Sequence, residues 1–182
     1  MPPTAGPEAT INKSVWSFLA SVLILGFLGP LSLDVGSIPI TLQSLVVFSI
    51  ALILRPREFF VCISAYLLLG AAGVKVFAGY TAGFEKLLGP TSGFLWGFLF
   101  VGTLLSWIHQ HYPLYFNHLL ICAFGAHVLL LFMGFSVLAI QSPEADTQSL
   151  VVNLLPGLLI KTLCVALIVR GISLIQSRTI AS

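Results

Sequence analysis

The chain has 182 residues, of which 58% are hydrophobic and only 8% are charged. A soluble domain carries about 25% charged residues, so this composition excludes an ordinary soluble enzyme or soluble binding domain. The net charge of +2 is no sign of nucleic-acid binding, because membrane topology accounts for the few basic residues, and no nucleic-acid partner is expected.

Six apolar runs along the chain predict an all-α membrane protein with six transmembrane helices. Residues 1–13 are expected to form a disordered cytoplasmic tail, residues 14–175 the six-helix membrane domain, and residues 176–182 a second cytoplasmic tail. No separate soluble domain is expected, so function must lie in the helices and their short loops. The expected spans are 15–33, 38–54, 59–74, 91–108, 114–140 and 151–175.

The basic residues predict which side of the membrane each loop faces. Six crossings place both termini on one side, together with the connections at 55–58 and 109–113. That side carries five basic residues and the opposite side two, namely Lys13, Arg55, Arg57, Arg170 and Arg178 against Lys75 and Lys86. Because Lys and Arg favour cytoplasmic loops, both termini are expected in the cytoplasm, in an inner or cytoplasmic membrane.

Polar and small side chains mark several of these spans. Pro39 fixes a turn before the second span, where Thr41 and Gln43 offer hydrogen-bonding groups to a pocket or to a neighbouring helix. Asn153 offers the same chemistry at the outer end of the sixth span. Small residues on the first helix would let another helix, internal or from a partner, approach closely: Ser14, Ser17, Ala20 and Ser21.

Residues 70–98 form a glycine-rich, aromatic loop between two apolar runs. Six glycines from Gly70 to Gly93 allow sharp turns and close approach of the backbone to a ligand. Irregular backbone at membrane depth is tolerated only where it is buried in protein or lines a cavity. Phe77, Tyr80 and Phe84 add flat apolar surface, so this loop is a candidate ligand site, with an ordinary extracellular turn as the alternative.

Titratable side chains elsewhere do not form an enzyme motif. The histidines and cysteines have neither metal-ligand spacing nor a nucleophile partner, and the cysteines all fall inside spans, where small apolar packing is their expected role. We therefore expect no catalytic residue, no metal and no cofactor. These residues are His109, His111, His118, His127, Cys62, Cys122 and Cys164.

Lys161 is the one formal charge well inside a span. An ammonium at the bilayer centre costs about 2.5–3.5 kcal/mol, so it needs an anion, a water-filled cavity or a route to the interface. A sixth helix that starts near Pro156 would place Lys161 about one turn below the outer surface. No acid lies inside a span to pair with it, which predicts either an external carboxylate ligand or a contact with Glu85 of the glycine-rich loop.

Taken together, these segments resemble the BioY family, the biotin-specific substrate-binding (S) components of energy-coupling factor (ECF) transporters. The resemblance covers about residues 14–175. Each motif alone is modest, but four in register are specific. They are Pro39-Ile40-Thr41-Leu42-Gln43, Val76-Phe77-Ala78-Gly79, Leu88-Gly89-Pro90-Thr91-Ser92-Gly93-Phe94 and Pro156-Gly157 with Ile160-Lys161.

This resemblance implies a six-helix bundle with an outward-facing pocket. It implies high-affinity biotin binding and uptake across the membrane, without any enzymatic activity. The expected partners are biotin, membrane lipid, a transmembrane coupling subunit and two ATP-binding-cassette ATPases. The coupling subunit would contact Ser17, Ala20 and Ser21.

Residue by residue, the resemblance assigns the biotin valerate carboxylate to Lys161 and the ligand's rings to the turn at Phe77, Ala78, Gly79 and Tyr80. Thr41 and Gln43 fall in the region that closes the pocket.

The chain departs from the family at two positions. Leu158 stands where the family commonly has an aspartate that contacts the ureido group, and Lys75 replaces a usual proline. The polar candidates to compensate are Asn153, Gln43 and Thr162. The alternative is an S component of the same architecture for another small carboxylate, such as a biotin precursor.

Overall fold

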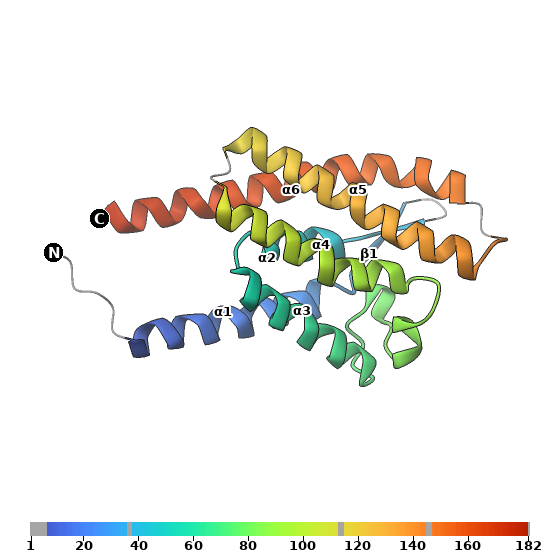
Figure 1. The fold of residues 1–182 in the computed structure, drawn as a ribbon, viewed down its shortest axis with the longest axis horizontal. Coiled ribbons are helices and arrows are strands. Elements are labelled where there is room, and N and C mark those ends of the chain that lie inside the picture. The colour runs from blue at the N-terminus through green and yellow to red at the C-terminus, as the bar shows by residue number, and fades with distance from the viewer. Residues whose placement is uncertain (1–6, 36–37, 113–114, 145–146, 182) are drawn as a thin grey trace.

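The computed structural model describes residues 7–35, 38–112, 115–144 and 147–181. These residues form six α-helices, one two-stranded antiparallel sheet and two short 3-10 turns (Figure 1). The helices are α1 (Pro7–Leu28), α2 (Gln43–Ala51), α3 (Pro56–Ala71), α4 (Ser92–His111), α5 (Phe116–Gln141) and α6 (Thr147–Ala181). The strands are β1 (Ser32–Val35) and β2 (Ile38–Thr41), and the 3-10 turns are η1 (Ala78–Tyr80) and η2 (Phe84–Leu87).

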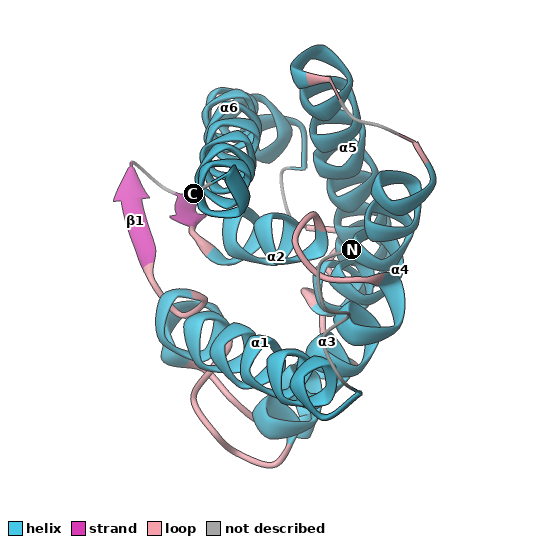
Figure 2. Cartoon of the chain, turned by 90° about the vertical axis from the view of Figure 1, so that its left-hand side faces the viewer, coloured by secondary structure: helices cyan, strands magenta, loops and turns pink. Residues whose placement is uncertain are grey.

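Helix α2 is the centre of the bundle. It contacts each of the other five helices and lies in the middle of the view in Figure 2. All of its residues except Leu45 are buried, and Val47, Phe48 and Ala51 are fully enclosed. Because nine residues rise only about 14 Å, α2 is far shorter than a hydrocarbon core of about 30 Å.

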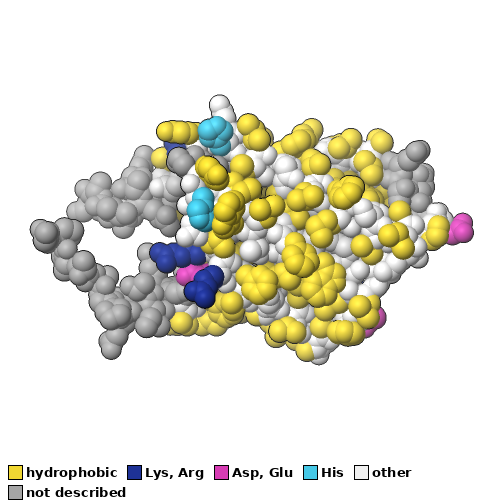
Figure 3. Space-filling model, in the orientation of Figure 1, with side chains coloured by type: hydrophobic (Ala, Val, Ile, Leu, Met, Phe, Trp, Pro, Cys, Tyr) yellow, Lys and Arg dark blue, Asp and Glu magenta, His cyan; other side chains and the backbone are white. Residues whose placement is uncertain are grey.

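The long helices and the apolar surface agree with a membrane protein. Three segments of the described chain are long and apolar enough to cross a membrane, namely Ser92–His111, Phe116–Gln141 and Ser149–Ile175. Figure 3 shows apolar side chains over the middle of one face, with the charged and histidine side chains toward its ends. Large exposed residues such as Phe27, Leu68 and Phe132 would be a liability in water but suit lipid.

Helix boundaries follow from local chemistry. Gly29-Pro30 follows the end of α1, and Pro56 occupies the first turn of α3, where its missing N–H is not needed. The Arg55 backbone N–H donates to the Glu58 carboxylate at 3.3 Å and completes that helix start.

Several boundaries differ from the sequence-based expectation. Helix α1 begins at Pro7, inside the expected tail of residues 1–13, while residues 1–6 lie outside the described residues. Helix α6 begins at Thr147 rather than near Pro156, which lies inside it, and continues to Ala181 through most of the expected tail of residues 176–182. Because proline has no amide N–H, the helix loses only one hydrogen bond at Pro156. The apolar residues on both sides keep the helix continuous.

The segment from Ser32 to Thr41 is also different from the prediction. It forms the β1–β2 pair, in which Leu33 faces Ile40 and Asp34 faces Pro39. The expected second span of residues 38–54 is therefore part strand and part short helix. Three further membrane crossings beyond the long helices remain a prediction.

Candidate ligand-binding site

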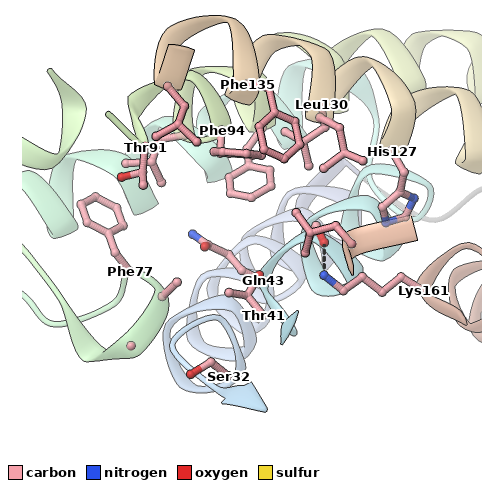
Figure 4. Close-up of a pocket in the computed structure, with 18 of the residues that line it drawn as sticks. Ser32, Thr41, Gln43, Phe77, Thr91, Phe94, His127, Leu130, Phe135 and Lys161 are labelled. Carbon is pink, nitrogen blue, oxygen red and sulfur yellow. Dashed lines mark hydrogen bonds between the residues drawn. The ribbon is translucent and has the colours of Figure 1, made fainter. Parts of the chain in front are cut away.

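A cavity of about 420 Å³ lies between α2, α4, α5, α6 and the loop that joins α3 to α4 (Figure 4). This size falls within the roughly 300–1,000 Å³ of small-molecule sites. Most of its surface is apolar, from residues such as Phe94, Phe98 and Leu130. A few polar side chains lie at its two ends, which are called here the loop end (residues 77–91) and the helical end (Ser44, His127 and Lys161).

The loop end is built by backbone turns. Phe77 and Thr81 form an isolated antiparallel bridge, with N···O distances of 3.0 and 3.3 Å. Between them Gly79 adopts φ +68°, a left-handed conformation that glycine takes without strain, and its N–H donates to the Pro30 carbonyl at 3.0 Å. The loop is thereby held against the end of α1.

Tyr66 of α3 anchors the same loop from inside the bundle. Its side chain is fully buried, and its hydroxyl donates to the Val76 carbonyl at 2.7 Å. It accepts a hydrogen bond from Gln43 Nε2, also at 2.7 Å. One phenol therefore joins α2, α3 and the start of the loop.

Phe77 packs where α3 carries no side chain. A Cβ atom added to Gly70 would collide with the Phe77 ring, and that ring also meets Tyr66 edge-on with centroids 5.7 Å apart. The Gly70 carbonyl accepts from Gly83 N–H at 2.8 Å. Glycine at position 70 is thus required by close packing against the Phe77 ring, whereas the sequence predicted sharp turns and close approach to a ligand.

Lys161 lies at the helical end of the cavity. Because α6 begins at Thr147, Lys161 is fourteen residues into the helix, or about 21 Å along its axis. This is deeper than the one turn expected from a helix start near Pro156. Its ammonium donates to Ser44 Oγ of α2 at 3.2 Å, the dashed line in Figure 4.

None of the described residues along this cavity carries a carboxylate. Glu85, the acid considered as a partner for Lys161, is exposed on η2 and lies outside the lining. Among the described side chains, the Lys161 ammonium therefore has a hydroxyl as its hydrogen-bond partner and no negative charge beside it in the cavity. A cation in such a place attracts an anionic or strongly polar ligand.

His127 of α5 is a polar residue of the site that the sequence did not single out. It lines the cavity, is 3% exposed, and meets the Phe48 ring edge-on with centroids 4.7 Å apart. Its Nδ1 lies 2.9 Å from the Ala123 carbonyl and 3.4 Å from Thr162 Oγ1. A single titratable ring in the middle of an apolar helix was the available signal, but no second histidine stands beside it in the sequence to mark it as a site residue.

The structure brings together most of the residues predicted for the site. Seven of them line the cavity: Thr41, Gln43, Phe77, Ala78, Gly79, Leu158 and Lys161. Tyr80 is 57% exposed with φ +56°, and Asn153 is exposed on α6, so both side chains lie outside the lining. A ligand contact for these two remains a prediction without geometric support. Leu158 is buried and presents only methyl groups where the resemblance expects a carboxylate.

The small residues of α1 lie away from this cavity. Ser21 is buried against the bundle, Ser17 is half-buried and Ala20 is exposed. Only part of the stripe is therefore available to another protein.

Fold and cavity together define the class of this protein. It is a helical membrane protein whose bundle forms a cavity of small-molecule size, lined by a partly buried lysine. A family model described as the BioY family matches residues 7–178, and the chain belongs to that family.

Individual relatives agree with this assignment. The chain is 30% identical to the "Biotin transporter BioY" of Rhizobium etli over 168 residues, which cover 85% of this chain and 88% of that protein. It is 50% identical to the "Biotin transporter BioY2" of Lactococcus lactis over 88 residues, 48% of each chain. The chain thus spans about half the length of this relative, and between 41% and 48% of others that match it in the same way.

One solved structure has the same fold. It is described as the S-component for biotin from an ECF-type ABC transporter, with a TM-score of 0.80 over 93% of this chain and 95% of that one. The two sequences are 24% identical, so this likeness establishes the fold alone.

Proposed function

We propose that this chain binds biotin with high affinity and takes it up across the membrane as the substrate-specific component of an ECF-type transporter. The observation that carries the proposal is the cavity in which Lys161 lies beyond an aromatic, backbone-shaped loop. Membership of the BioY family and the names of its relatives support biotin as the ligand. The chain acts as a transport component and catalyses no reaction.

The cavity suits the chemistry of biotin. Biotin combines an apolar bicyclic core and aliphatic tail with a polar ureido group and a carboxylate. The apolar walls would cover the core and tail, while polar side chains at the two ends would bind the groups that carry charge or hydrogen bonds. The site residues in this proposal are Lys161, Phe77, Ala78, Gly79, Thr41, Gln43 and Leu158, and Tyr80 and Asn153 are kept as predicted contacts outside the observed lining.

We also propose six membrane crossings, with both termini in the cytoplasm and the cavity facing outward. The start of α1 and the end of α6 lie at the same end of the molecule in Figure 1, which supports an even number of crossings. The loop of residues 72–91 lies toward the other end. The basic residues favour the cytoplasm for the end that carries Arg55, Arg57 and Arg170.

The energy for uptake would come from two ATP-binding-cassette ATPases, which would act on this chain through a transmembrane coupling subunit. The coupling subunit would approach α1 at the predicted residues Ser17, Ala20 and Ser21, where short side chains allow close helix packing. Ala20 is exposed and Ser17 half-buried, whereas the buried Ser21 would lie behind the contact surface. The exposed apolar face of α1, including Trp16, Leu23 and Phe27, would meet lipid or that subunit.

Calorimetric titration of the detergent-purified protein tests the ligand. Nanomolar to low-micromolar binding of biotin, with weaker binding of dethiobiotin, would support the proposal. If a folded, monodisperse sample bound dethiobiotin or another small carboxylate tightly and biotin not at all, the alternative ligand would replace it.

A further inference from the structure

His127 offers a hydrogen-bonding atom that no described residue of the chain uses. The ring lines the cavity, and its Nε2 atom is buried without a hydrogen-bond partner among the described residues. Buried polar atoms are nearly always paired in folded proteins, so a buried unpaired atom beside a ligand cavity is a candidate ligand contact.

The neighbouring atoms fix which hydrogen-bonding role Nε2 plays. Nδ1 lies 2.9 Å from the Ala123 carbonyl, and a carbonyl oxygen can only accept, so Nδ1 carries the hydrogen and donates. In the neutral ring Nε2 then has a lone pair and no hydrogen. The histidine therefore presents an acceptor to the cavity.

This acceptor lies beside donors. Figure 4 shows His127 at the same end of the cavity as Lys161, and both residues line it. Thr162, which follows Lys161 in α6, lies 3.4 Å from the other ring nitrogen. The Lys161 ammonium and the Ser44 hydroxyl supply the donors of this end.

A donor next to an acceptor suits a ligand group that itself offers both an acceptor and a donor. A bare carboxylate has only lone pairs, and against Nε2 it would find no donor. A cyclic urea carries a C=O and an N–H on adjacent atoms, which match the Lys161 ammonium and His127 Nε2 respectively.

We propose that His127 Nε2 accepts a hydrogen bond from a ureido N–H of the bound ligand, and that His127 thereby determines specificity in place of a carboxylate at position 158. Leu158 cannot accept a hydrogen bond, and His127 lines the same cavity from the adjacent helix α5. This inference rests on the proposed biotin function. It also assigns the ureido carbonyl, rather than the valerate carboxylate, to Lys161.

The test compares three forms of the full chain: the parent, His127→Leu and His127→Gln. Each is titrated with biotin and with two analogues in which one or the other ureido N–H is replaced by N–CH₃. His118→Leu is the matched control, because His118 lies on the same helix, is exposed and does not line the cavity.

His127→Leu should weaken biotin binding about tenfold to hundredfold, because the ligand N–H then lacks a partner in a dry site. Methylation of the contacting ureido nitrogen should lower the affinity of the parent for the ligand much more than it lowers the affinity of His127→Leu. His127→Gln should stay within about fivefold of the parent, since its amide oxygen can accept near the position of Nε2. His118→Leu should match the parent.

Two results would overturn the inference and leave the biotin function standing. One is biotin binding by His127→Leu within about twofold of the parent. The other is an equal penalty for methylation in both proteins for both analogues. If the parent itself bound no biotin, the proposed function would fail, and this inference with it.

A measurement on the parent protein covers the case in which His127→Leu fails to fold. With ¹⁵N-labelled histidine, biotin should shift the Nε2 resonance of His127, and the analogue methylated at the contacting nitrogen should not. The His127→Gln protein identifies the resonance by its loss. An unshifted Nε2 signal at saturating biotin would refute the contact.

Discussion

The two ends of the cavity are constructed by different means. At the loop end, backbone conformation determines the shape of the cavity. Gly79 has a positive φ, Gly70 leaves room for the Phe77 ring, and Phe77 is held through hydrogen bonds of both its N–H and its carbonyl to Thr81. At the helical end, regular helices carry functional side chains, and His127 and Lys161 come from adjacent helices that place their polar atoms in the same space.

This difference indicates what each end contributes. The loop end supplies shape, so substitutions there should act through geometry and stability. The helical end supplies charge and hydrogen bonds, so substitutions there should act on ligand chemistry while the fold persists. Substitutions at each end should show whether shape and ligand chemistry separate in this way.

The largest effect is expected at the helical end. Lys161→Ala should weaken biotin binding about tenfold to hundredfold, because a charge-assisted hydrogen bond is lost from a dry site. Lys161→Met, which keeps most of the aliphatic stem, should lose as much biotin affinity as Lys161→Ala. Lys75→Met, on the exposed loop, should keep the affinity of the parent. Titration calorimetry on the three proteins measures this, and unchanged affinity in Lys161→Met would remove the lysine from the site.

A smaller effect, on stability as well as binding, is expected at the loop end. Gly70→Ala places a Cβ against the Phe77 ring and should lower the free energy of unfolding by about 1–3 kcal/mol. Biotin binding should weaken too, since Phe77 must move. Thermal unfolding in detergent measures the first effect. Gly125→Ala on α5 is the control, because a Cβ there meets nothing within 4 Å; equal behaviour of the two variants would contradict the packing argument.

Tyr66→Phe should cost about 1–2 kcal/mol of stability, because the Val76 carbonyl and the Gln43 amide lose a buried partner. Its ligand selectivity should be that of the parent, with all ligands weakened alike. The ratio of affinities for biotin and its N-methyl analogues, measured in both proteins, checks this. A changed ratio would mean that the anchor also contacts the ligand. Tyr112→Phe, at an exposed tyrosine, serves as the reference.

The smallest expected effect is the coupling free energy between the Lys161 side chain and the biotin carboxylate, which should be near zero. If Lys161 donates to the ureido carbonyl, amidation of the biotin carboxylate should weaken binding to the parent and to Lys161→Ala by the same factor, within about twofold. A clearly smaller loss in Lys161→Ala would instead place the carboxylate on Lys161, as the family resemblance implies.

Sequence reasoning predicted the shape-giving parts of this site better than its hydrogen-bonding parts. The glycines and aromatics of residues 70–98, and Lys161 within an apolar helix, stand out locally because each violates the composition around it. His127 and Tyr66 do not, since a lone ring in an apolar run gives no indication of which neighbour it will face.

The element boundaries show the same limit. Pro156 was expected to start the sixth helix, yet the bundle tolerates it inside α6. The β1–β2 pair was missed because its apolar residues continue the hydrophobic pattern of the second span. Only the packing around α2 determines where the strand ends and that helix begins.

The Tyr66 anchor has a consequence for the timing of transport. If biotin leaves past residues 77–81, the loop must first separate from α3, and the buried hydrogen bonds of one phenol must break during that step. Each 1.4 kcal/mol added to that barrier lengthens the residence time about tenfold. We therefore expect tight binding to result mainly from slow release. The loop end would then set the dissociation rate, and the helical end would set which ligand binds.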